Sequence, residues 1–275
     1  MLALIAGQGH LPMVLIKALR LQGTDFQLCQ MADFPANVFI DQDVLEFRIE
    51  HLGSFLQQLK DRGVTQVVFA GAVHRPKIDP TAIDAATMPL VPRMMQALQQ
   101  GDDAALRTVI EIFEEAGLTI CAAHQIMPDL MLPEGVLTAV KPGDQHLRDA
   151  DRGEQVIGAL SAADIGQACV VARGQVIAVE TLPGTDWMLS SLDPARLPQS
   201  DARPTGGLMY KAPKTGQDRR IDMPTIGPDT IHGIAAAGLD GLVIEAGGVQ
   251  VLDRAKVILL ADEKGLFLWA RKRSS

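Results

Sequence analysis

The first 123 residues alternate between short apolar segments and longer helix-like segments, and this alternation constrains the fold more than any other feature of the chain. Short apolar segments are typical of buried strands. The helix-like segments end at glycines, which adopt the positive φ of a helix C-terminus without strain. Strands that alternate with helices predict a parallel, right-handed, doubly wound sheet. The expected strands are residues 2–6, 26–30, 66–70 and 118–122, and the expected helices end at Gly23, Gly63 and Gly117.

The second half of the chain has a different pattern, in which two pairs of strand-like segments flank glycine-containing turns. Such pairs are typical of antiparallel hairpins, because glycine allows a tight turn. The pairs are residues 168–172 with 175–180, and residues 242–246 with 249–252. Further helices are expected from Pro228 and after Asp253, and a final strand at residues 266–270. This half is therefore predicted to be a mixed α/β domain.

Residues 127–143 separate the two patterns and contain three prolines and two glycines with weak periodicity. This composition is typical of a connector between domains. We therefore predict an α/β domain with a parallel sheet at residues 1–130, a linker at 131–146 and a distinct mixed α/β domain at 147–275.

Composition and charge exclude several classes of protein. The formal net charge of the 275-residue chain is −8, which argues against a nucleic-acid partner, because binding to phosphates requires a basic surface. The three cysteines are far apart and form no C-x-x-C pair, which indicates reduced thiols. No segment approaches 18 uncharged apolar residues, and the apolar run at the N-terminus is too short for a signal peptide. We expect a cytoplasmic protein.

The segment Gly7-Gln8-Gly9-His10-Leu11-Pro12 directly follows the first expected strand and opens a helix. Its glycines allow the backbone to approach a phosphate, and the helix N-terminus offers unpaired N–H groups. A tight strand-to-helix turn without a ligand explains the same residues. Pro12 replaces the third glycine of a dinucleotide fingerprint, and no acidic residue ends the second expected strand at Gln30. These two observations weaken a nicotinamide-cofactor interpretation and leave a nucleotide or sugar phosphate.

Two further segments contain candidate ligand-binding residues. Arg75 follows the expected strand at residues 66–70, at the end where open α/β sheets bind ligands, and a phosphate-binding role competes with that of a surface arginine. Thr185 is expected to cap a helix with Asp186 in its first turn, which is a sufficient structural explanation for both. The alternative is that Asp186 points at a metal ion or a phosphate.

Residues 206–228 give the strongest signal of a catalytic site. Lys211 and Lys214 supply two cations, and Asp218 and Asp222 supply two carboxylates, in a segment rich in glycine and proline. Hydrolysis of a pyrophosphate needs cations that neutralise its oxygens, and carboxylates that bind Mg²⁺ or orient water. A solvated charged loop is the competing interpretation. Other hydrolytic sites are not indicated, since the sequence has no H-x-x-x-H zinc pair, no G-x-S-x-G elbow and no P-loop.

Several of these segments, in this order, resemble the LpxI family of UDP-2,3-diacylglucosamine pyrophosphatases, which act in lipid A synthesis in Gram-negative bacteria. The resemblance covers nearly the whole chain. Its motifs are Leu4-Ile5-Ala6-Gly7-Gln8-Gly9-His10-Leu11-Pro12, Ala70-Gly71-Ala72-Val73-His74-Arg75-Pro76, Gly101-Asp102-Asp103-Ala104-Ala105-Leu106, Asp164-Ile165-Gly166-Gln167, Ala178-Val179-Glu180, Gly184-Thr185-Asp186, Lys211-Ala212-Pro213-Lys214 and Arg220-Ile221-Asp222-Met223-Pro224-Thr225-Ile226-Gly227-Pro228.

The resemblance implies a Rossmann-like N-terminal domain, a distinct C-terminal α/β domain and a hydrolase. The implied reaction is Mg²⁺-dependent attack of water on the β-phosphorus, which yields UMP and 2,3-diacylglucosamine 1-phosphate. The family's essential aspartate matches Asp222, and Lys211 and Lys214 are the other implied catalytic residues. Asp222 and Asp186 are the candidate metal ligands. The implied substrate-binding residues are Gly7, Gln8, Gly9, His10, Leu11, Gly71, Val73, Arg75, Gln167, Thr185, Asp186, Thr225 and Gly227.

The acyl chains of such a substrate imply transient contact with the cytoplasmic face of the inner membrane. Two other hypotheses remain at this point. A nicotinamide-dependent oxidoreductase would use the Gly7–Gly9 turn to bind its dinucleotide. A sugar-nucleotide sensor would use the segment from Lys211 to Asp222 for binding alone.

Overall fold

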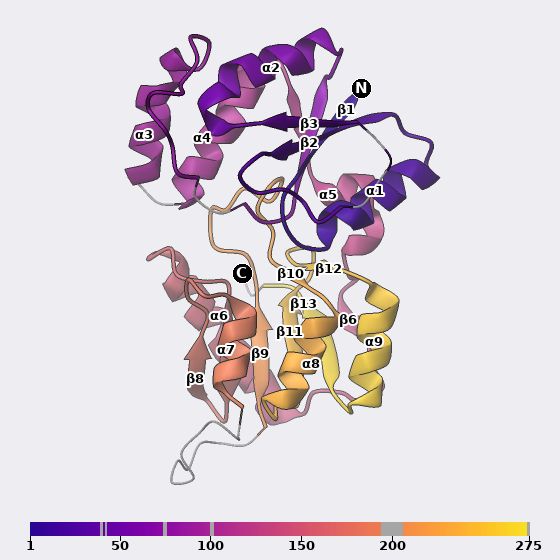
Figure 1. The fold of residues 1–275 in the computed structure, drawn as a ribbon. Helices are drawn as coiled ribbons and strands as arrows, with labels where there is room; N and C mark the ends of the chain where they lie inside the picture. The colour runs from indigo at the N-terminus through magenta and orange to yellow at the C-terminus, as the bar shows by residue number, and fades with distance from the viewer. Residues whose placement is uncertain (39–40, 42, 74–75, 100–101, 194–205, 274–275) are drawn as a thin grey trace. The chain divides into compact units, whose positions relative to one another are not determined.

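The computed structural model describes residues 1–38, 41, 43–73, 76–99, 102–193 and 206–273 (Figure 1). The chain divides into two compact units, Met1–Pro128 and Asp129–Ser275. Each unit has its own sheet. None of the helices in the described part of the chain combines the length and the apolar character needed to cross a bilayer.

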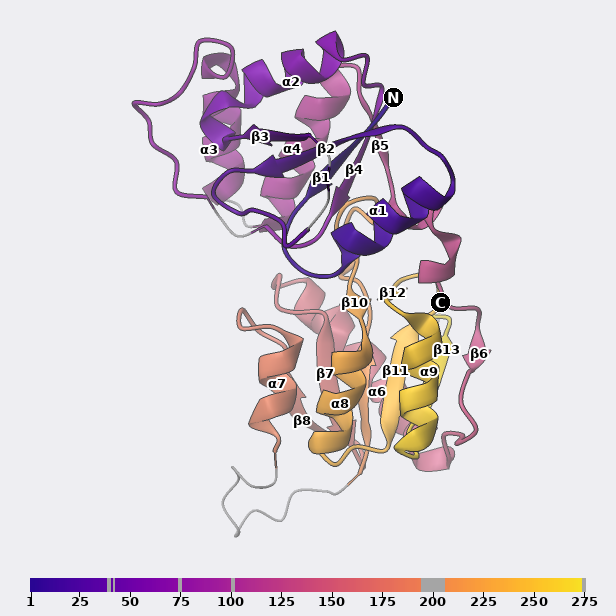
Figure 2. The ribbon, with the colours of Figure 1, turned by 45° about the vertical axis from the view of Figure 1, so that its right-hand side comes forward.

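The N-terminal unit is built on a five-stranded sheet in the order β3-β2-β1-β4-β5, in which all neighbouring strands are parallel. Helices α1 and α5 lie on one face of this sheet, and α2, α3 and α4 lie on the other (Figure 1 and Figure 2). The described elements are β1 (Leu2–Ala6), α1 (Leu11–Leu21), β2 (Phe26–Met31), β3 (Val44–Phe47), α2 (Leu52–Asp61), β4 (Gln66–Ala70), α3 (Val91–Gln99), α4 (Asp102–Glu115), β5 (Thr119–Cys121) and α5 (Ala123–Ile126), with 3-10 turns at Ile49–His51 and Met88–Leu90. A further 3-10 turn, Pro128–Leu130, spans the boundary between the two units.

The fold of this unit confirms the doubly wound parallel sheet that the sequence predicts. All five residues of β1 are buried, as expected for a central strand covered on both faces. Glycines with positive φ end α1 at Gly23 and α2 at Gly63. β3 was not predicted from the sequence. This strand has only four residues, and they are not continuously buried like those of the central strand β1.

The C-terminal unit contains a six-stranded mixed sheet in the order β6-β13-β11-β9-β7-β8 and a separate parallel pair of β10 with β12. Strands β9, β11 and β13 run parallel to one another, and β7 and β6 are antiparallel to their neighbours. The elements are β6 (Gly135–Val136), α6 (Asp144–Ser161), β7 (Ala168–Ala172), β8 (Gln175–Val179), α7 (Thr185–Ser191), β9 (Leu208–Lys211), β10 (Thr225–Ile226), α8 (Pro228–Ala236), β11 (Gly241–Glu245), β12 (Gln250–Val251), α9 (Arg254–Glu263) and β13 (Phe267–Arg271).

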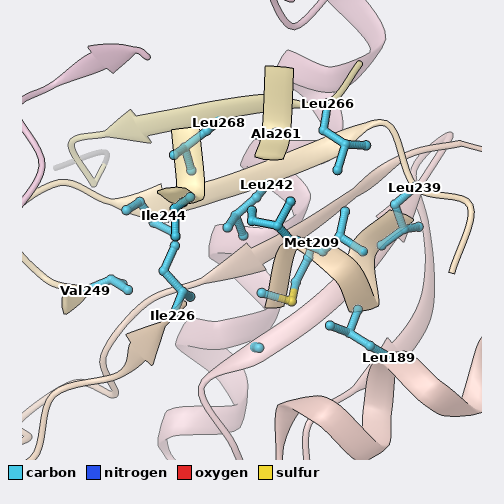
Figure 3. Close-up of a cluster of buried hydrophobic side chains, with 14 of the residues drawn as sticks. Leu189, Met209, Ile226, Leu239, Leu242, Ile244, Val249, Ala261, Leu266 and Leu268 are labelled. Atoms are coloured by element: carbon cyan, nitrogen blue, oxygen red, sulfur yellow. The ribbon is translucent and has the colours of Figure 1, made fainter. Parts of the chain in front are cut away.

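Alternate residues of the central strands pack on opposite faces of this sheet, which follows from the period of two of a strand. Met209, Leu242 and Leu268 join the larger apolar cluster with residues of α7, α8 and α9 (Figure 3). Leu208 and Tyr210 face the other way and pack with residues of α6. The unit therefore has three layers, with helices on both faces of the sheet, and it confirms the mixed α/β class predicted for the second half.

One of the two predicted hairpins is correct and the other is wrong. β7 and β8 form the expected antiparallel pair. The segment at residues 242–246 is instead β11, which lies between β9 and β13 and pairs in parallel with both. Both edges of β11 are therefore occupied, so the chain that follows Gly247 and Gly248 cannot return alongside it. That chain forms β12, which pairs with β10.

Candidate active site

In the N-terminal unit, the structure brings two of the predicted ligand-binding segments into direct contact. The N–H of Gly7 donates to the carbonyl of Ala70 at 2.7 Å, and Gln8 and Ala72 exchange backbone hydrogen bonds of 2.8 and 2.9 Å. A Cβ atom on Gly7 would lie 2.5 Å from the carbonyl oxygen of Ala72, and one on Gly71 would lie 2.5 Å from that of Gln8. Glycine is required at both positions because the two backbones touch.

The contact between these segments lies where open α/β sheets bind their ligands. β1 and β4 are neighbours in the sheet, and the chain leaves them toward α1 on one face and toward α3 and α4 on the other. This is a topological switch point, and ligands bind outside the carboxyl ends of the strands there. His10 precedes α1 and Pro12 lies in its first turn, as expected. These adjoining segments contain seven of the predicted substrate-binding residues, of which Val73 is exposed. The other six are Gly7, Gln8, Gly9, His10, Leu11 and Gly71. Arg75 lies outside the described residues.

The end of β2 differs from the prediction in a way that matters for nucleotide binding. The strand was expected to end at Gln30 without an acidic residue. It continues to Met31, and Asp33 follows in a turn closed by a 3.0 Å hydrogen bond from Phe34 N–H to the carbonyl of Met31. A carboxylate therefore does stand just beyond the second strand, where a ribose-binding acid is found in dinucleotide-binding folds.

In the C-terminal unit, Lys211 is the last residue of β9 and is only 5% exposed. Its Nζ donates to Oγ1 of Thr185 at 2.6 Å, and Thr185 Oγ1 donates to Oε1 of Glu180 at 2.5 Å. The other oxygen of Glu180 accepts a hydrogen bond of 2.8 Å from Gln167 N–H. The predicted residues Lys211, Thr185 and Gln167 thus belong to one hydrogen-bonded cluster, with Glu180 at its centre.

The surroundings of Lys211 decide its charge. Burial lowers the pKa of Lys211, and the carboxylates of Glu180 and Asp186 act in the opposite direction. Thr185 is not the helix cap that we expected, because Gly184 occupies that position and Thr185 is the first helical residue of α7. The hydroxyl of Thr185 is used for Lys211 and Glu180 instead.

The segment that follows β9 is tied to the sheet by charged and polar contacts. Lys214 Nζ pairs with the carboxylate of Asp164, and Lys214 N–H donates to Oε1 of Gln217 at 2.9 Å. The amide of Gln217 in turn donates to the carboxylate of Asp222. Asp222 is half-buried. These contacts hold Lys214, Gln217 and Asp222 in place relative to one another.

Two arginines complete the anchoring of this segment. Arg219 Nη2 pairs with Oε1 of Glu245 at 2.6 Å. Glu245 is 4% exposed and ends β11, beside β9 in the sheet. Arg220 pairs with both carboxylate oxygens of Asp218, and these hydrogen bonds lower the pKa of Asp218. Asp218 is therefore engaged in holding the segment together.

The remaining predicted residues lie where the segment ends. Thr225 is in β10, and its hydroxyl donates to the carbonyl of Met223 at 3.2 Å. Gly227 precedes α8, and its N–H donates to Thr230 Oγ1 at 3.2 Å. Both positions follow Asp222 closely in the chain and fix the end of its segment against a strand and a helix.

Sequence reasoning missed the partners of the catalytic candidates. Glu180, Asp164 and Gln217 each contact a predicted residue, and Glu245 holds Arg219. Glu180 and Asp164 stand inside the motifs quoted above. The pairings of Asp164 with Lys214 and of Glu245 with Arg219 join positions distant in the sequence, so no periodicity or spacing identifies them, and the local contacts of Gln217 and Glu180 follow no recognised motif.

The carboxylates of the C-terminal unit differ in how well they fit Mg²⁺. Among the residues that the structure describes, no three His, Cys, Asp or Glu side chains gather into a group that could enclose a metal ion. Mg²⁺ does not need such a cage, because it commonly binds one or two carboxylates and completes its shell with water and phosphate oxygens. Asp222, held by Gln217, suits one such ligand. Asp186 suits it less well, because the Lys211 cation is close enough to act on it.

Models of two protein domains match the two parts of the chain. Residues 1–130 match the family model described as the LpxI N-terminal domain, and residues 133–269 match the LpxI C-terminal domain. The chain is 39% identical over 270 residues to the UDP-2,3-diacylglucosamine pyrophosphatase LpxI of Caulobacter vibrioides. This similarity covers 97% of the chain and 96% of that protein.

Proposed function

The chain belongs to the LpxI family, and from this membership we propose that it hydrolyses the pyrophosphate bond of UDP-2,3-diacylglucosamine in lipid A synthesis. The products are UMP and 2,3-diacylglucosamine 1-phosphate. Hydrolysis is favoured over an oxidoreductase or a sensor because the similar protein named above is a pyrophosphatase.

The observation that supports this reaction best is the cluster at the carboxyl end of β9. A pyrophosphate is hydrolysed slowly because its negative oxygens repel an incoming nucleophile. Lys211 and Lys214 lie three residues apart at this end of the sheet, and both are held by carboxylates. Preorganised cations of this kind stabilise the charge that develops on the phosphate oxygens in the transition state.

Asp222 is assigned the role of orienting the attacking water and accepting its proton. Its carboxylate is fixed by the Gln217 amide, and Gln217 is fixed by the N–H of Lys214. A general base works best when it is held in one orientation toward the reacting atom. In the alternative role, Asp222 would hold Mg²⁺, which would supply a Lewis acid for the phosphate oxygens.

The substrate also suggests where the protein works. Its acyl chains belong in a membrane, so we assign the protein to the cytoplasm with transient contact at the inner-membrane surface. Leu182 and Trp187 support this assignment, because they are 97% and 55% exposed and flank Thr185 and Asp186. Tryptophan prefers the membrane–water interface. Sedimentation with lipid vesicles should therefore weaken when Leu182 and Trp187 are both replaced by serine.

The experiment that tests the function is the release of UMP from UDP-2,3-diacylglucosamine by the purified protein, with and without EDTA. Absence of UMP under both conditions would contradict the function. UMP release that is unaffected by EDTA would contradict the role of Mg²⁺ alone. In H₂¹⁸O, attack on the β-phosphorus places the label in the sugar phosphate, whereas label in UMP would show attack on the α-phosphorus.

A further inference from the structure

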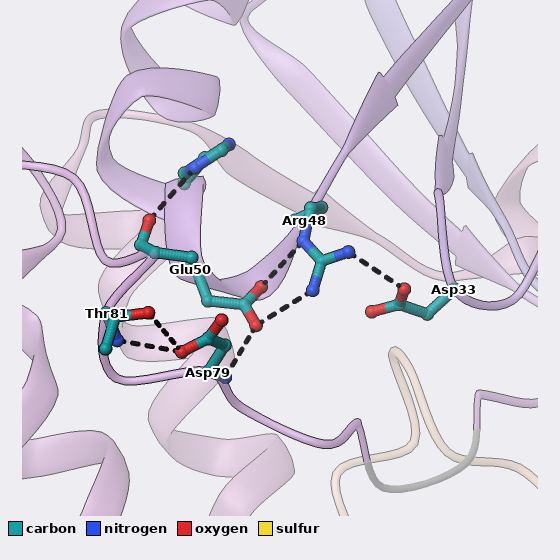
Figure 4. A network of polar contacts seen from close by, with 7 residues as sticks. Asp33, Arg48, Glu50, Asp79 and Thr81 are labelled. Carbon is teal, nitrogen blue, oxygen red and sulfur yellow. Dashed lines mark hydrogen bonds and ion pairs between the residues drawn. The ribbon is translucent and has the colours of Figure 1, made fainter.

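The N-terminal unit contains a network of polar contacts at the carboxyl ends of β2 and β3 that the proposed reaction does not use (Figure 4). Asp33 follows β2, Arg48 follows β3, and Asp79 lies in the chain after β4. We propose that Asp33 binds the ribose of the uridine nucleotide through its 2′-hydroxyl. This inference rests on the proposed function for the identity of the nucleotide.

Asp33 lies in the turn that follows β2. β2 lies beside β1 in parallel register, with Ala6 opposite Gln30. The turn after β2 therefore emerges next to the Gly7–Gly9 turn, at the same edge of the sheet. In doubly wound sheets the turn after the first strand takes the phosphate, and a carboxylate after the second strand accepts a hydrogen bond from the ribose. The described strand order, with β1 between β2 and β4, is the order that this arrangement requires.

Asp33 is held by Arg48, which is itself held by a buried carboxylate. Arg48 Nη1 contacts Asp33 Oδ1 at 3.3 Å, and Arg48 Nε and Nη2 donate to the two oxygens of Glu50 at 3.2 and 3.1 Å. Glu50 is 1% exposed, and its Oε1 also accepts from Asp79 N–H at 2.9 Å. A buried carboxylate thus fixes Arg48, and Arg48 fixes Asp33. The Asp33 side chain is 33% exposed and is therefore accessible to a ligand.

A carboxylate next to a bound phosphate would repel it, unless a cation neutralises the carboxylate. Arg48 does so, because its guanidinium contacts Asp33 on one side and Glu50 on the other. The arrangement leaves Asp33 as a hydrogen-bond acceptor for hydroxyl groups without leaving it an isolated charge. Such a group prefers a ribonucleotide to a deoxyribonucleotide.

The test compares the binding of UMP and 2′-deoxy-UMP to the full-length protein by isothermal titration calorimetry. Loss of one hydrogen bond to a charged group should weaken binding by on the order of tenfold or more, so the wild-type protein should prefer UMP by that ratio. In Asp33→Asn the ratio should fall most of the way to one. The matched control is Asp61→Asn, an exposed aspartate of the same unit, which should keep the wild-type ratio.

Three outcomes would overturn the inference: equal binding of the two nucleotides by the wild type, an unchanged ratio in Asp33→Asn, or no binding of UMP at all. The first comparison needs no variant, so a misfolded Asp33→Asn would not remove the test. A merely structural Asp33 would weaken both ligands equally and leave the ratio intact. The inference and the proposed function can fail separately. If the protein prefers UMP to 2′-deoxy-UMP but does not hydrolyse UDP-2,3-diacylglucosamine, the proposed function is wrong and the inference stands. If it hydrolyses the substrate but binds both nucleotides equally, the inference is wrong and the proposed function stands.

Discussion

At the scale of single residues, the candidate site is defined by how its charged groups are paired. Lys211 is buried, and the Thr185 hydroxyl lies between its Nζ and Glu180, which are themselves 4.0 Å apart. A buried cation without such partners would lose its proton or destabilise the fold. We therefore expect the hydroxyl of Thr185 to contribute more to activity and stability than the packing of its side chain does.

Replacing Thr185 by Val should lower the rate of UMP release about tenfold and destabilise the C-terminal unit by about 1–3 kcal/mol, because it leaves buried polar groups without a partner. Thr185→Ser retains the hydroxyl and should recover most of both losses. Measurements of kcat, KM and the thermal midpoint distinguish the two variants. Equal behaviour of Val and Ser would show that the hydroxyl is not needed.

Replacing Asp222 by Ala should reduce kcat by on the order of a hundredfold or more, as loss of a preorganised catalytic group does. The fold should survive, since Asp222 is half-buried and its partner Gln217 is also accessible to water. Asp229→Ala, at an exposed position of the same unit, provides the control for a general effect of losing a carboxylate. Near-normal release of UMP by the Asp222 variant would show that the assignment of Asp222 is wrong.

The candidate residues that could be predicted are those whose type indicates their chemistry. Lysines and aspartates in a proline-rich segment point to phosphate chemistry wherever the segment lies. Glu180 could not be found in this way, because its role depends on Lys211, 31 positions later in the sequence. Asp33 was missed for a smaller reason: the strand before it continues to Met31, one residue beyond its predicted end.

At the scale of elements, the turns after β1 and β4 act as one unit because their backbones touch. Gly71 has a φ of +91°, and a Cβ there would lie 2.5 Å from the carbonyl oxygen of Gln8. Gly63 also has a positive φ, of +72°, but a Cβ there would meet nothing within 4 Å. The two glycines separate the effect of backbone strain from the effect of displacing the turn.

Gly71→Ala should therefore destabilise the N-terminal unit by about 1–3 kcal/mol and weaken the binding of UMP, because the Gly7–Gly9 turn must move. Gly63→Ala should cost about 1 kcal/mol for its φ and leave UMP binding unchanged. Chemical denaturation and calorimetric titration measure the two effects. If both variants bind UMP like the wild type, the turn is not part of the nucleotide site.

The elements themselves were predictable to different degrees. β1, β4 and α1 have strong local signals, namely continuous apolar residues, a terminal glycine and a proline in the first turn. The pairing of β11 was not predictable, because the Gly247-Gly248 dipeptide favours a hairpin locally and only competition from β9 and β13 prevents it. Local sequence determines where a strand lies, whereas its partners depend on the whole sheet.

The contacts of Glu50 link two elements and should make the N-terminal unit sensitive to acid. Burial acts to raise the pKa of Glu50, but hydrogen bonds from Arg48 and from the N–H of Asp79 outweigh it and hold this pKa below its ordinary value of 4.5. A lowered folded-state pKa stabilises the fold above the ordinary pKa, and this stabilisation is lost as the pH falls through the folded-state value.

Glu50→Gln should therefore be clearly less stable than the wild type at neutral pH, and the difference should shrink as the pH falls below about 4.5. Thermal unfolding measured from neutral pH to about pH 3 gives this difference directly. A difference that stays constant over this range would mean that the amide replaces the carboxylate fully in its hydrogen bonds and that the charge contributes nothing.

At the scale of the whole molecule, an acidic protein is proposed to act on an acidic substrate. The net charge of −8 would repel a pyrophosphate from most of the surface. At the carboxyl ends of β9, β11 and β13 each cation is paired with a carboxylate: Lys211 with Glu180, Arg219 and Arg273 with Glu245, and Arg271 with Asp151 and Glu154. The carboxylates there hold the cations in place, so the local field depends on geometry more than on total charge.

The two units have separate cores, and this separation makes a prediction about how the chain unfolds. Leu4 in β1 and Ile244 in β11 are both completely buried, each within its own unit. Replacing either by Ala should cost about 2–5 kcal/mol, through the lost transfer energy and the cavity left behind. Hydrogen exchange measured by mass spectrometry should then accelerate in the unit that contains the substitution and remain unchanged in the other, because cooperative unfolding follows contiguous packing.

Leu4→Ala and Ile244→Ala serve as controls for each other. Equal acceleration in both units after either substitution would show that residues 1–128 and 129–275 unfold as one body.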